Sequence, residues 1–157
     1  MFCSSVLRVL PKVRMDSYES SDIVPNRGIS PFVVGMTEQE LFKVIPANTP
    51  KRSFGTCYTV KVGSITLWID RTSKQVTQVG VSKGYTGSVF GAVKIGTSAK
   101  DAEKIFGNFV INGDYQLVVP EIPGISFQLS PALNELSPKP MEDALIDGIY
   151  VYRASNA

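Results

Sequence analysis

Histidine is absent from the 157 residues of this chain, and this absence excludes more chemistry than any other feature of the composition. Histidine is the usual general base near neutral pH, the usual partner of a serine or cysteine nucleophile and the commonest metal ligand in proteins. Asp, Glu, Lys, Tyr and Ser remain, but the commonest catalytic arrangements cannot be built. We therefore expect a protein that is not an enzyme and that holds no metal or cofactor.

Cysteine is scarce as well. The two cysteines, Cys3 and Cys57, lie far apart and lack the Cys-x-x-Cys spacing of a zinc site or a redox pair. We expect two reduced thiols, as in a cytoplasmic protein, and the sequence leaves open a disulfide between them. Cys57 could act as a nucleophile only beside a base, so a packed thiol is the better interpretation.

Long apolar runs and an excess of charge are also missing. No apolar run approaches the length of a transmembrane helix, and basic residues interrupt the first segment, MFCSSVLRVLPKVRM, so that it lacks the apolar core of a signal peptide. Lys+Arg 16 against Asp+Glu 14 give a net charge of +2, which supplies no electrostatic reason to bind nucleic acid or an anionic membrane. We expect a cytoplasmic protein that binds neither.

What is present is an internal repeat. The segments VVGMTEQELFKVIP (33–46) and KIGTSAKDAEKIFG (94–107) align with a shift of 94 − 33 = 61 residues. In each, a hydroxyl residue precedes an acidic residue by three positions, as Thr37 precedes Glu40 and Ser98 precedes Asp101. This spacing is typical of a capping box, in which the two side chains satisfy free N–H groups of the first helical turn. The repeat therefore predicts two short capped helices.

Segments of alternating apolar residues follow each predicted helix, and alternation indicates strands with one buried face. After the first helix these segments are 56–62, 64–70 and 76–81, and after the second they are 115–119, 124–129 and 146–153. The expected fold is α+β, with two tandem units that each contain a short helix and an antiparallel three-stranded sheet. One such unit is marginal alone, so we expect the two to bury against each other.

The expected boundaries follow from composition. We place an irregular N-terminal arm at 1–32, the first unit at 33–82, a Gly-rich connector at 83–93 and the second unit at 94–157, with a Pro-rich insertion at 130–140.

The helix opening GMT-x-x-E, from Gly35 to Glu40, followed by a small antiparallel sheet, resembles the SmpA/OmlA (BamE-like) domain. Two such units in tandem resemble the beta-lactamase inhibitor protein (BLIP-like) architecture. The sequence pattern of residues 33–153 is also similar to that of bacterial toxin-immunity proteins of this architecture. The resemblance implies a protein that binds other proteins. The chain lacks the signal and lipobox of the lipoproteins and the disulfide-rich pattern of the secreted inhibitor, which favours the immunity group.

The candidate binding residues lie on the predicted strands opposite the core. If Ile65, Leu67 and Ile69 face the core, Trp68 faces the other way, and alternation places Tyr150 and Tyr152 on the same side of the sheet. Trp, Tyr and Arg often dominate protein–protein contacts. The predicted partner-binding residues are therefore Trp68, Tyr150, Tyr152, Tyr85, Arg71 and Arg153.

Two other interpretations of these aromatic residues stay open. The rings could pack beneath the N-terminal arm or the Pro-rich insertion, or they could stack on single-stranded nucleic acid, against which the near-neutral charge argues. The expected function is that of a cytoplasmic immunity protein that neutralises a cognate bacterial toxin. The alternative is a cell-envelope assembly scaffold of the SmpA/OmlA type.

Overall fold

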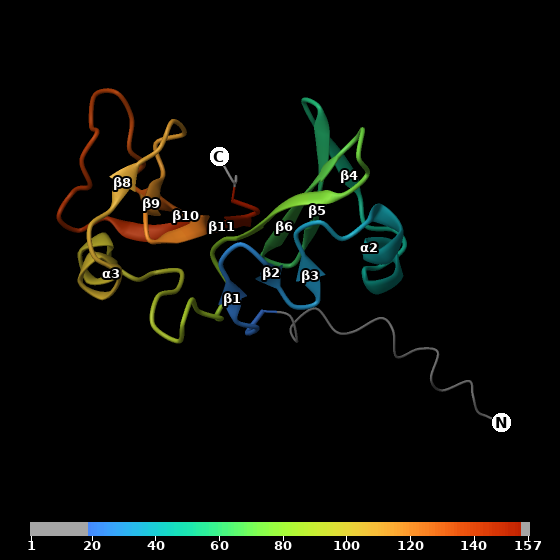
Figure 1. The fold of residues 1–157 in the computed structure, drawn as a ribbon, viewed down its shortest axis with the longest axis horizontal. Coiled ribbons are helices and arrows are strands. Elements are labelled where there is room, and N and C mark those ends of the chain that lie inside the picture. Colours follow the sequence, from blue (N-terminus) through green and yellow to red (C-terminus); the bar gives the residue numbers. More distant parts are fainter. Residues whose placement is uncertain (1–18, 155–157) are drawn as a thin grey trace.

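The computed structural model describes residues 19–154, which form two helices, one large sheet and one small sheet (Figure 1). The small sheet contains β1 (Ile23–Val24), β2 (Gly28–Ile29) and β3 (Phe32–Val33). The first half of the large sheet contains β4 (Lys51–Phe54), β5 (Cys57–Val62), β6 (Ile65–Asp70) and β7 (Val76–Val81), and the second half contains β8 (Val110–Ile111), β9 (Leu117–Val119), β10 (Ile122–Ser130) and β11 (Leu145–Tyr152). The helices are α2 (Glu38–Val44) and α3 (Ala99–Phe106).

The large sheet is antiparallel throughout and has the strand order β4-β5-β6-β7-β11-β10-β9-β8. Its two halves meet at the centre, where β7 pairs with β11 and Val79 lies opposite Val151. The pairing satisfies backbone groups that would otherwise form two exposed sheet edges.

The expectation of two tandem units, each with one helix and three strands, is therefore wrong. Four strands follow each helix, and the strands of both halves form one continuous eight-stranded sheet in a mostly β fold. The strands that the sequence did not predict are β4 and β8, at the two edges. All four residues of β4 are exposed, so its sequence shows no alternation of apolar and polar residues.

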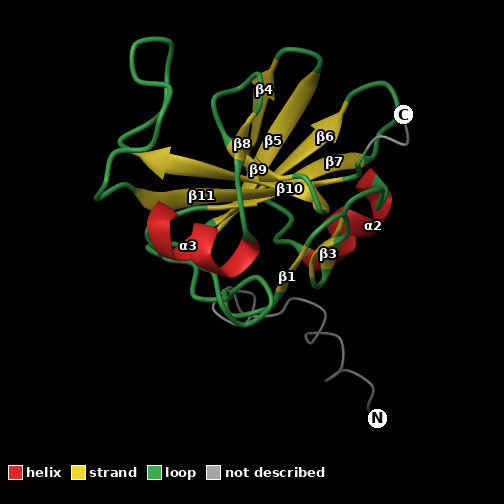
Figure 2. Ribbon diagram, turned by 60° about the vertical axis from the view of Figure 1, so that its left-hand side comes forward, coloured by secondary structure: helices red, strands yellow, loops and turns green. Residues whose placement is uncertain are grey.

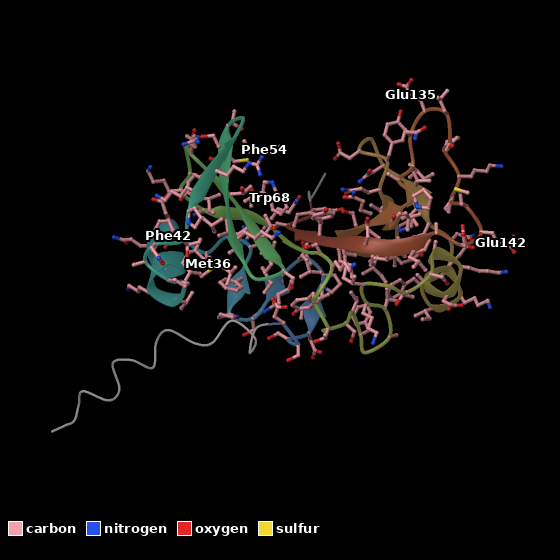
Figure 3. The ribbon with its side chains drawn as sticks, turned by 180° about the vertical axis from the view of Figure 1, so that it is seen from behind. Met36, Phe42, Phe54, Trp68, Glu135 and Glu142 are labelled. Atoms are coloured by element: carbon pink, nitrogen blue, oxygen red, sulfur yellow. The ribbon has the colours of Figure 1, made fainter. Side chains whose placement is uncertain are left out.

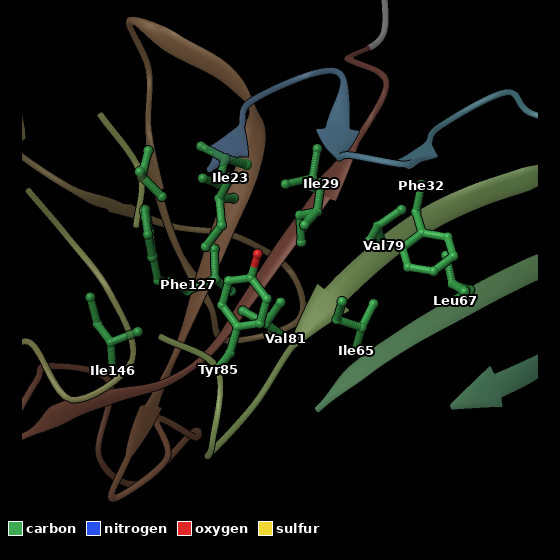
Figure 4. Close-up of a cluster of buried hydrophobic side chains, with 14 of the residues drawn as sticks. Ile23, Ile29, Phe32, Ile65, Leu67, Val79, Val81, Tyr85, Phe127 and Ile146 are labelled. Carbon is green, nitrogen blue, oxygen red and sulfur yellow. The ribbon is translucent and has the colours of Figure 1, made fainter. Parts of the chain in front are cut away.

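The prediction of an irregular N-terminal arm is also wrong. Residues 23–33 form the small three-stranded sheet, whose side chains Ile23, Ile29 and Phe32 are at most 1% exposed. These side chains point toward the centre of the large sheet and pack with Leu67 and Val79 in the core (Figure 4). Strands of two residues are too short to produce a periodic pattern in the sequence. Residues 1–18 of the expected arm lie outside the described residues.

Both predicted helices are present, and the complete capping box is found at α2, whereas at α3 only the hydroxyl half of it forms. The hydroxyl of Thr37 accepts a hydrogen bond from the Glu40 N–H at 3.1 Å, and the Glu40 carboxylate accepts one from the Thr37 N–H at 2.8 Å. Ser98 caps α3 by accepting a 3.0 Å hydrogen bond from the Asp101 N–H. The first helix ends before Pro46 and the second ends at Gly107.

The repeated glycine before each helix has an equivalent place in both halves. The Gly35 N–H donates to the Val76 carbonyl at 2.7 Å, and the Gly96 N–H donates to the Ile146 carbonyl at 2.8 Å. Both glycines have a positive φ, 97° and 96°, which other residues rarely adopt. Each helix is thus joined by its opening turn to one of the two central strands, β7 and β11.

The two helices and the small sheet all lie on the same face of the large sheet (Figure 2). On that face Phe106 of α3 stacks on Phe127 of β10, with ring centroids 5.9 Å apart. The small sheet packs between the two helices, and the hairpins β4–β5 and β8–β9 rise from the two ends of the sheet on the opposite side (Figure 1). Within the described part of the chain, neither helix is long and apolar enough to cross a membrane.

Candidate partner-binding face

The face of the large sheet that carries no helix is called the open face below. It is defined by the side chains that alternate with the core residues of each strand. On β6 the core side chains are Ile65, Leu67 and Ile69, so Trp68 projects to the open face, where it is half-buried. On β11 the same alternation places the half-buried Tyr150 and Tyr152 on the open face.

Strand register brings these three rings together across the middle of the sheet. Trp68 lies opposite Gln78 on β7, and Gln78 lies opposite Tyr152 on β11. In the next row Gly80 lies opposite Tyr150. The rings of Trp68 and Tyr150 pack edge to face, with centroids 5.9 Å apart and an interplanar angle of 74°. This geometry is the one that aromatic pairs prefer.

Two glycines leave the space that the Tyr150 ring occupies. A Cβ atom on Gly80 would lie 2.6 Å from Tyr150 Cδ1 and 3.1 Å from Trp68 Cζ3, and one on Gly148 would lie 2.9 Å from the Tyr150 hydroxyl. That hydroxyl donates to Gln128 Oε1 at 2.8 Å. The Tyr150 ring is therefore fixed by contacts on both sides and by a hydrogen bond at its tip.

Both tyrosine hydroxyls remain protonated donors at neutral pH. Burial, with a smaller contribution from the Asp147 charge, raises the pKa of Tyr150, and burial also raises the pKa of Tyr152. The Tyr152 hydroxyl donates to the Ile125 carbonyl at 3.3 Å. The centre of the open face thus presents aromatic edges and neutral hydroxyl groups rather than charge.

Exposed apolar residues lie at both ends of the open face. Phe54 on β4 is 63% exposed and pairs with Cys57, and Figure 3 shows it on the same side of the sheet as Trp68, away from Phe42 of α2. At the other end, Val110 on β8 is 50% exposed. The sequence reasoning missed Phe54 and Val110 because they belong to the two edge strands that it did not predict.

The other three predicted binding residues lie elsewhere. Tyr85 is only 3% exposed, and its hydroxyl donates to the Ser21 carbonyl. The Arg153 guanidinium donates to the Val34 carbonyl at 3.1 Å. Arg71 extends toward α2, on the helix side of the sheet, where it donates to Ser53 Oγ at 2.7 Å. The structure therefore brings together Trp68, Tyr150 and Tyr152 and separates Tyr85, Arg71 and Arg153 from them.

The N-terminal segment does not cover the rings within the described part of the chain. The small sheet packs on the opposite face of the large sheet, against Leu67 and Val79 (Figure 4). The loop that contains the predicted Pro-rich insertion lies beside β8, at the other end of the large sheet from β4 (Figure 1). Glu135 of this loop lies well away from Trp68 (Figure 3).

The described residues contain no group of three or more Cys, Asp or Glu side chains arranged to hold a metal ion. Cys57 is a free, half-buried thiol whose Sγ lies 3.2 Å from the Phe54 carbonyl oxygen. Cys3, with which the sequence left a disulfide open, lies outside the described residues.

Comparisons of the chain with protein-family models, with curated proteins and with solved structures find no match.

Proposed function

We propose that the protein is a non-catalytic binding protein that captures another protein on its open face. In its most concrete form, it is an immunity protein that acts in the cytoplasm and neutralises a cognate bacterial toxin. Inhibition would be steric, because a partner seated on the sheet would have its own functional surface covered.

The observation that supports this proposal is the aromatic cluster of Trp68, Tyr150 and Tyr152 at the centre of a sheet face that no helix or strand of residues 19–154 covers. Antiparallel sheets commonly have one polar, solvated face opposite their core. Aromatic residues at the centre of an interface, surrounded by contacts that exclude water, supply much of the binding energy of protein complexes.

The cluster is also ordered before any partner arrives. The edge-to-face contact between Trp68 and Tyr150 and the hydrogen bond from Tyr150 to Gln128 hold the rings in place. Binding to rigid side chains costs less conformational entropy than binding to mobile ones. The net charge of +2 is small, so the proposed contact depends on packing and hydrogen bonds more than on long-range attraction.

The shape of the open face suits a protein partner. The hairpins β4–β5 and β8–β9 rise at its two ends, so a convex surface could rest on the aromatic centre while Phe54 and Val110 contact its flanks (Figures 1 and 3). This arrangement places apolar contacts at three points along the sheet.

Capture from an extract of the source cells tests the proposal. The full chain is immobilised and compared with the double variant Trp68→Ala/Tyr152→Ala and with the control Phe90→Ala, which removes a 65% exposed ring that packs on Phe106 of α3. We expect one protein to be retained by the wild type and the control and lost by the double variant. The purified protein should also inhibit that partner's activity. Equal capture by all three baits would refute the open face as the binding site.

A further inference from the structure

A polar pocket lies on the helix side of the sheet, between α2 and the edge formed by β4 and β5. It is a pocket of about 350 Å³ lined by Glu38, Lys51, Ser53, Tyr58, Arg71 and Lys74. Pockets of this size accommodate small organic ligands. The proposed partner-binding face does not use it.

Three cations converge on this pocket from separate parts of the chain. Lys51 lies on β4, whereas Arg71 and Lys74 lie in the turn between β6 and β7. The Arg71 guanidinium lies 5.5 Å from the centroid of the Tyr58 ring and donates to Ser53 Oγ at 2.7 Å. The Lys51 ammonium lies 5.1 Å from the centroid of the same ring, so two of the cations lie close to Tyr58.

The described part of the chain supplies no ion-pair partner to the three cations. Among residues 19–154, none of Lys51, Arg71 and Lys74 forms an ion pair. The one carboxylate of the pocket, on Glu38, accepts the hydrogen bond of the Tyr58 hydroxyl. Burial, followed by the hydrogen bond and charge of Glu38, raises the pKa of Tyr58, so that its hydroxyl stays protonated and keeps this bond. The lining side chains therefore carry a net charge of 3 − 1 = 2 positive units.

We propose that this pocket binds the dianion of a phosphate monoester. A phosphate monoester carries about −1.5 to −2 charges at pH 7, which complements the net charge of the pocket. The Arg71 guanidinium supplies a planar fork that matches two phosphate oxygens, and the two lysines supply point charges for the rest. The Ser53 hydroxyl, already hydrogen-bonded to Arg71, supplies a neutral donor at the same place.

A phosphate monoester fits the pocket better than the other common anions. A carboxylate or a phosphate diester carries a single negative charge and would leave one cation uncompensated. The volume of about 350 Å³ lies within the range of pockets that hold small organic molecules, so the site has room for the organic part of the ester. The ester could belong to a soluble metabolite or to a lipid headgroup, and these two sources share the same recognition chemistry.

Isothermal titration calorimetry on the full chain tests the site, with inorganic phosphate and glycerol 3-phosphate as the probes in a low-chloride buffer. We expect saturable one-to-one binding of both probes and at least tenfold weaker binding of acetate. Lys74→Gln and Arg71→Gln should each weaken phosphate binding about tenfold or more, because each removes a charged hydrogen bond. Arg71→Lys should also weaken binding, because it keeps the charge and loses the fork.

The matched control is Lys83→Gln, which removes an exposed lysine outside the pocket and should leave the affinity unchanged. Thermal melting of each variant shows whether it is folded. If Arg71→Gln does not fold, the phosphate affinity of Lys74→Gln tests the proposal instead. Vesicles that contain phosphatidic acid distinguish the two sources. Sedimentation of the wild type but not of Lys74→Gln with these vesicles would indicate a lipid, and binding of the soluble probes alone would indicate a metabolite. The proposal is overturned if no probe binds saturably, if acetate binds as tightly as phosphate, or if Lys83→Gln weakens binding as much as Lys74→Gln.

Discussion

The indole of Trp68 and the ring of Tyr150 pack edge to face, 5.9 Å apart, although 150 − 68 = 82 residues separate them in the chain. They meet because β7, which lies between their strands, carries Gly80 at the point where a side chain would keep them apart. The contact joins the first half of the large sheet to the second on the open face.

Replacing Trp68 with Ala should weaken binding of the captured partner by about 2 kcal/mol or more if Trp68 is a binding hot spot. The free energy of unfolding should change less than the binding free energy, because the indole is only half-buried among the described residues. Affinity is measured by calorimetry and stability by urea unfolding. Unchanged affinity with a lower free energy of unfolding would mean that Trp68 serves packing alone.

Gly80→Ala should destabilise the protein by about 1–3 kcal/mol, which is the usual cost of an overpacked site. The added methyl group would lie 2.6 Å from Tyr150 Cδ1, which is too close for either ring to stay in place. Urea unfolding measures the loss, and a change in Trp68 fluorescence in the folded state should accompany it.

The same substitution in a Tyr150→Ala background should cost clearly less, because the closest contact of the methyl group is gone and only the 3.1 Å approach to Trp68 Cζ3 remains. Gly113→Ala is the control for the loss of glycine itself, since a Cβ there meets no atom within 4 Å and Gly113 does not have a positive φ. An equal loss from Gly80→Ala in both backgrounds would contradict the role assigned to Gly80.

Phe127→Ala should cost about 3–5 kcal/mol of unfolding free energy. The Phe127 side chain is fully buried at the point where α3 packs on the sheet, and it contacts the rings of Phe106 and Phe109 at centroid distances of 5.9 Å. Phe54→Ala removes a ring that is 63% exposed and should change stability by no more than about 0.5 kcal/mol. Comparable losses from the two substitutions would place Phe127 outside the core.

Asp70→Asn should reduce stability at neutral pH, and the difference from the wild type should shrink in acid. The Ser73 N–H donates to the Asp70 carboxylate at 2.7 Å, and this contact, with smaller help from the Thr72 N–H, lowers the pKa of Asp70 below 3.8. A carboxyl group with a lowered folded-state pKa stabilises the protein above its unfolded-state pKa, and this contribution is lost as the pH falls through the folded-state value.

Urea unfolding at pH 7 and at several values below pH 4 measures this effect. Glu135→Gln, at an exposed position of the loop between β10 and β11 (Figure 3), is the control and should match the wild type throughout. A constant difference between Asp70→Asn and the wild type across this pH range would exclude the Asp70 charge as its cause.

The sequence predicted the elements whose residues alternate strongly. In β5, β6 and the middle of β10 the apolar core residues recur at every second position, as do Val79 and Val81 on β7 and Ile149 and Val151 on β11. The two helices were predicted because Thr37 and Ser98 cap them with side-chain hydrogen bonds that have a recognisable spacing. These signals are local, and a single sequence contains them.

No local sequence pattern predicted that the two halves of the large sheet would pair with each other. The pairing of β7 with β11 consists of backbone hydrogen bonds between residues far apart in the chain, and either strand would show the same alternation at the edge of a smaller sheet. The same limit applies to the site. Alternation placed Trp68 and Tyr150 on one face, whereas Arg71 lies in a turn, where alternation says nothing about the direction of the side chain.

The continuous sheet leads to a prediction about cooperativity. Ser98→Ala removes the cap of α3 in the second half, and this should cost about 1 kcal/mol, within the usual range for the loss of an N-cap. Trp68, the one tryptophan of the chain, lies in the first half. If the β7–β11 pairing makes both halves unfold together, the midpoint reported by Trp68 fluorescence must fall although the substitution lies in the other half.

Thr37→Ala removes the equivalent cap of α2 and is the matched comparison, because it weakens the half that contains the fluorophore. Both variants should lower the fluorescence midpoint by similar amounts, and circular dichroism should show a single transition at the same urea concentration. Coincident transitions by two probes are the test of two-state unfolding. If Ser98→Ala leaves the Trp68 midpoint unchanged and circular dichroism shows an earlier second transition, the halves are independent and the aromatic contact between Trp68 and Tyr150 does not couple them.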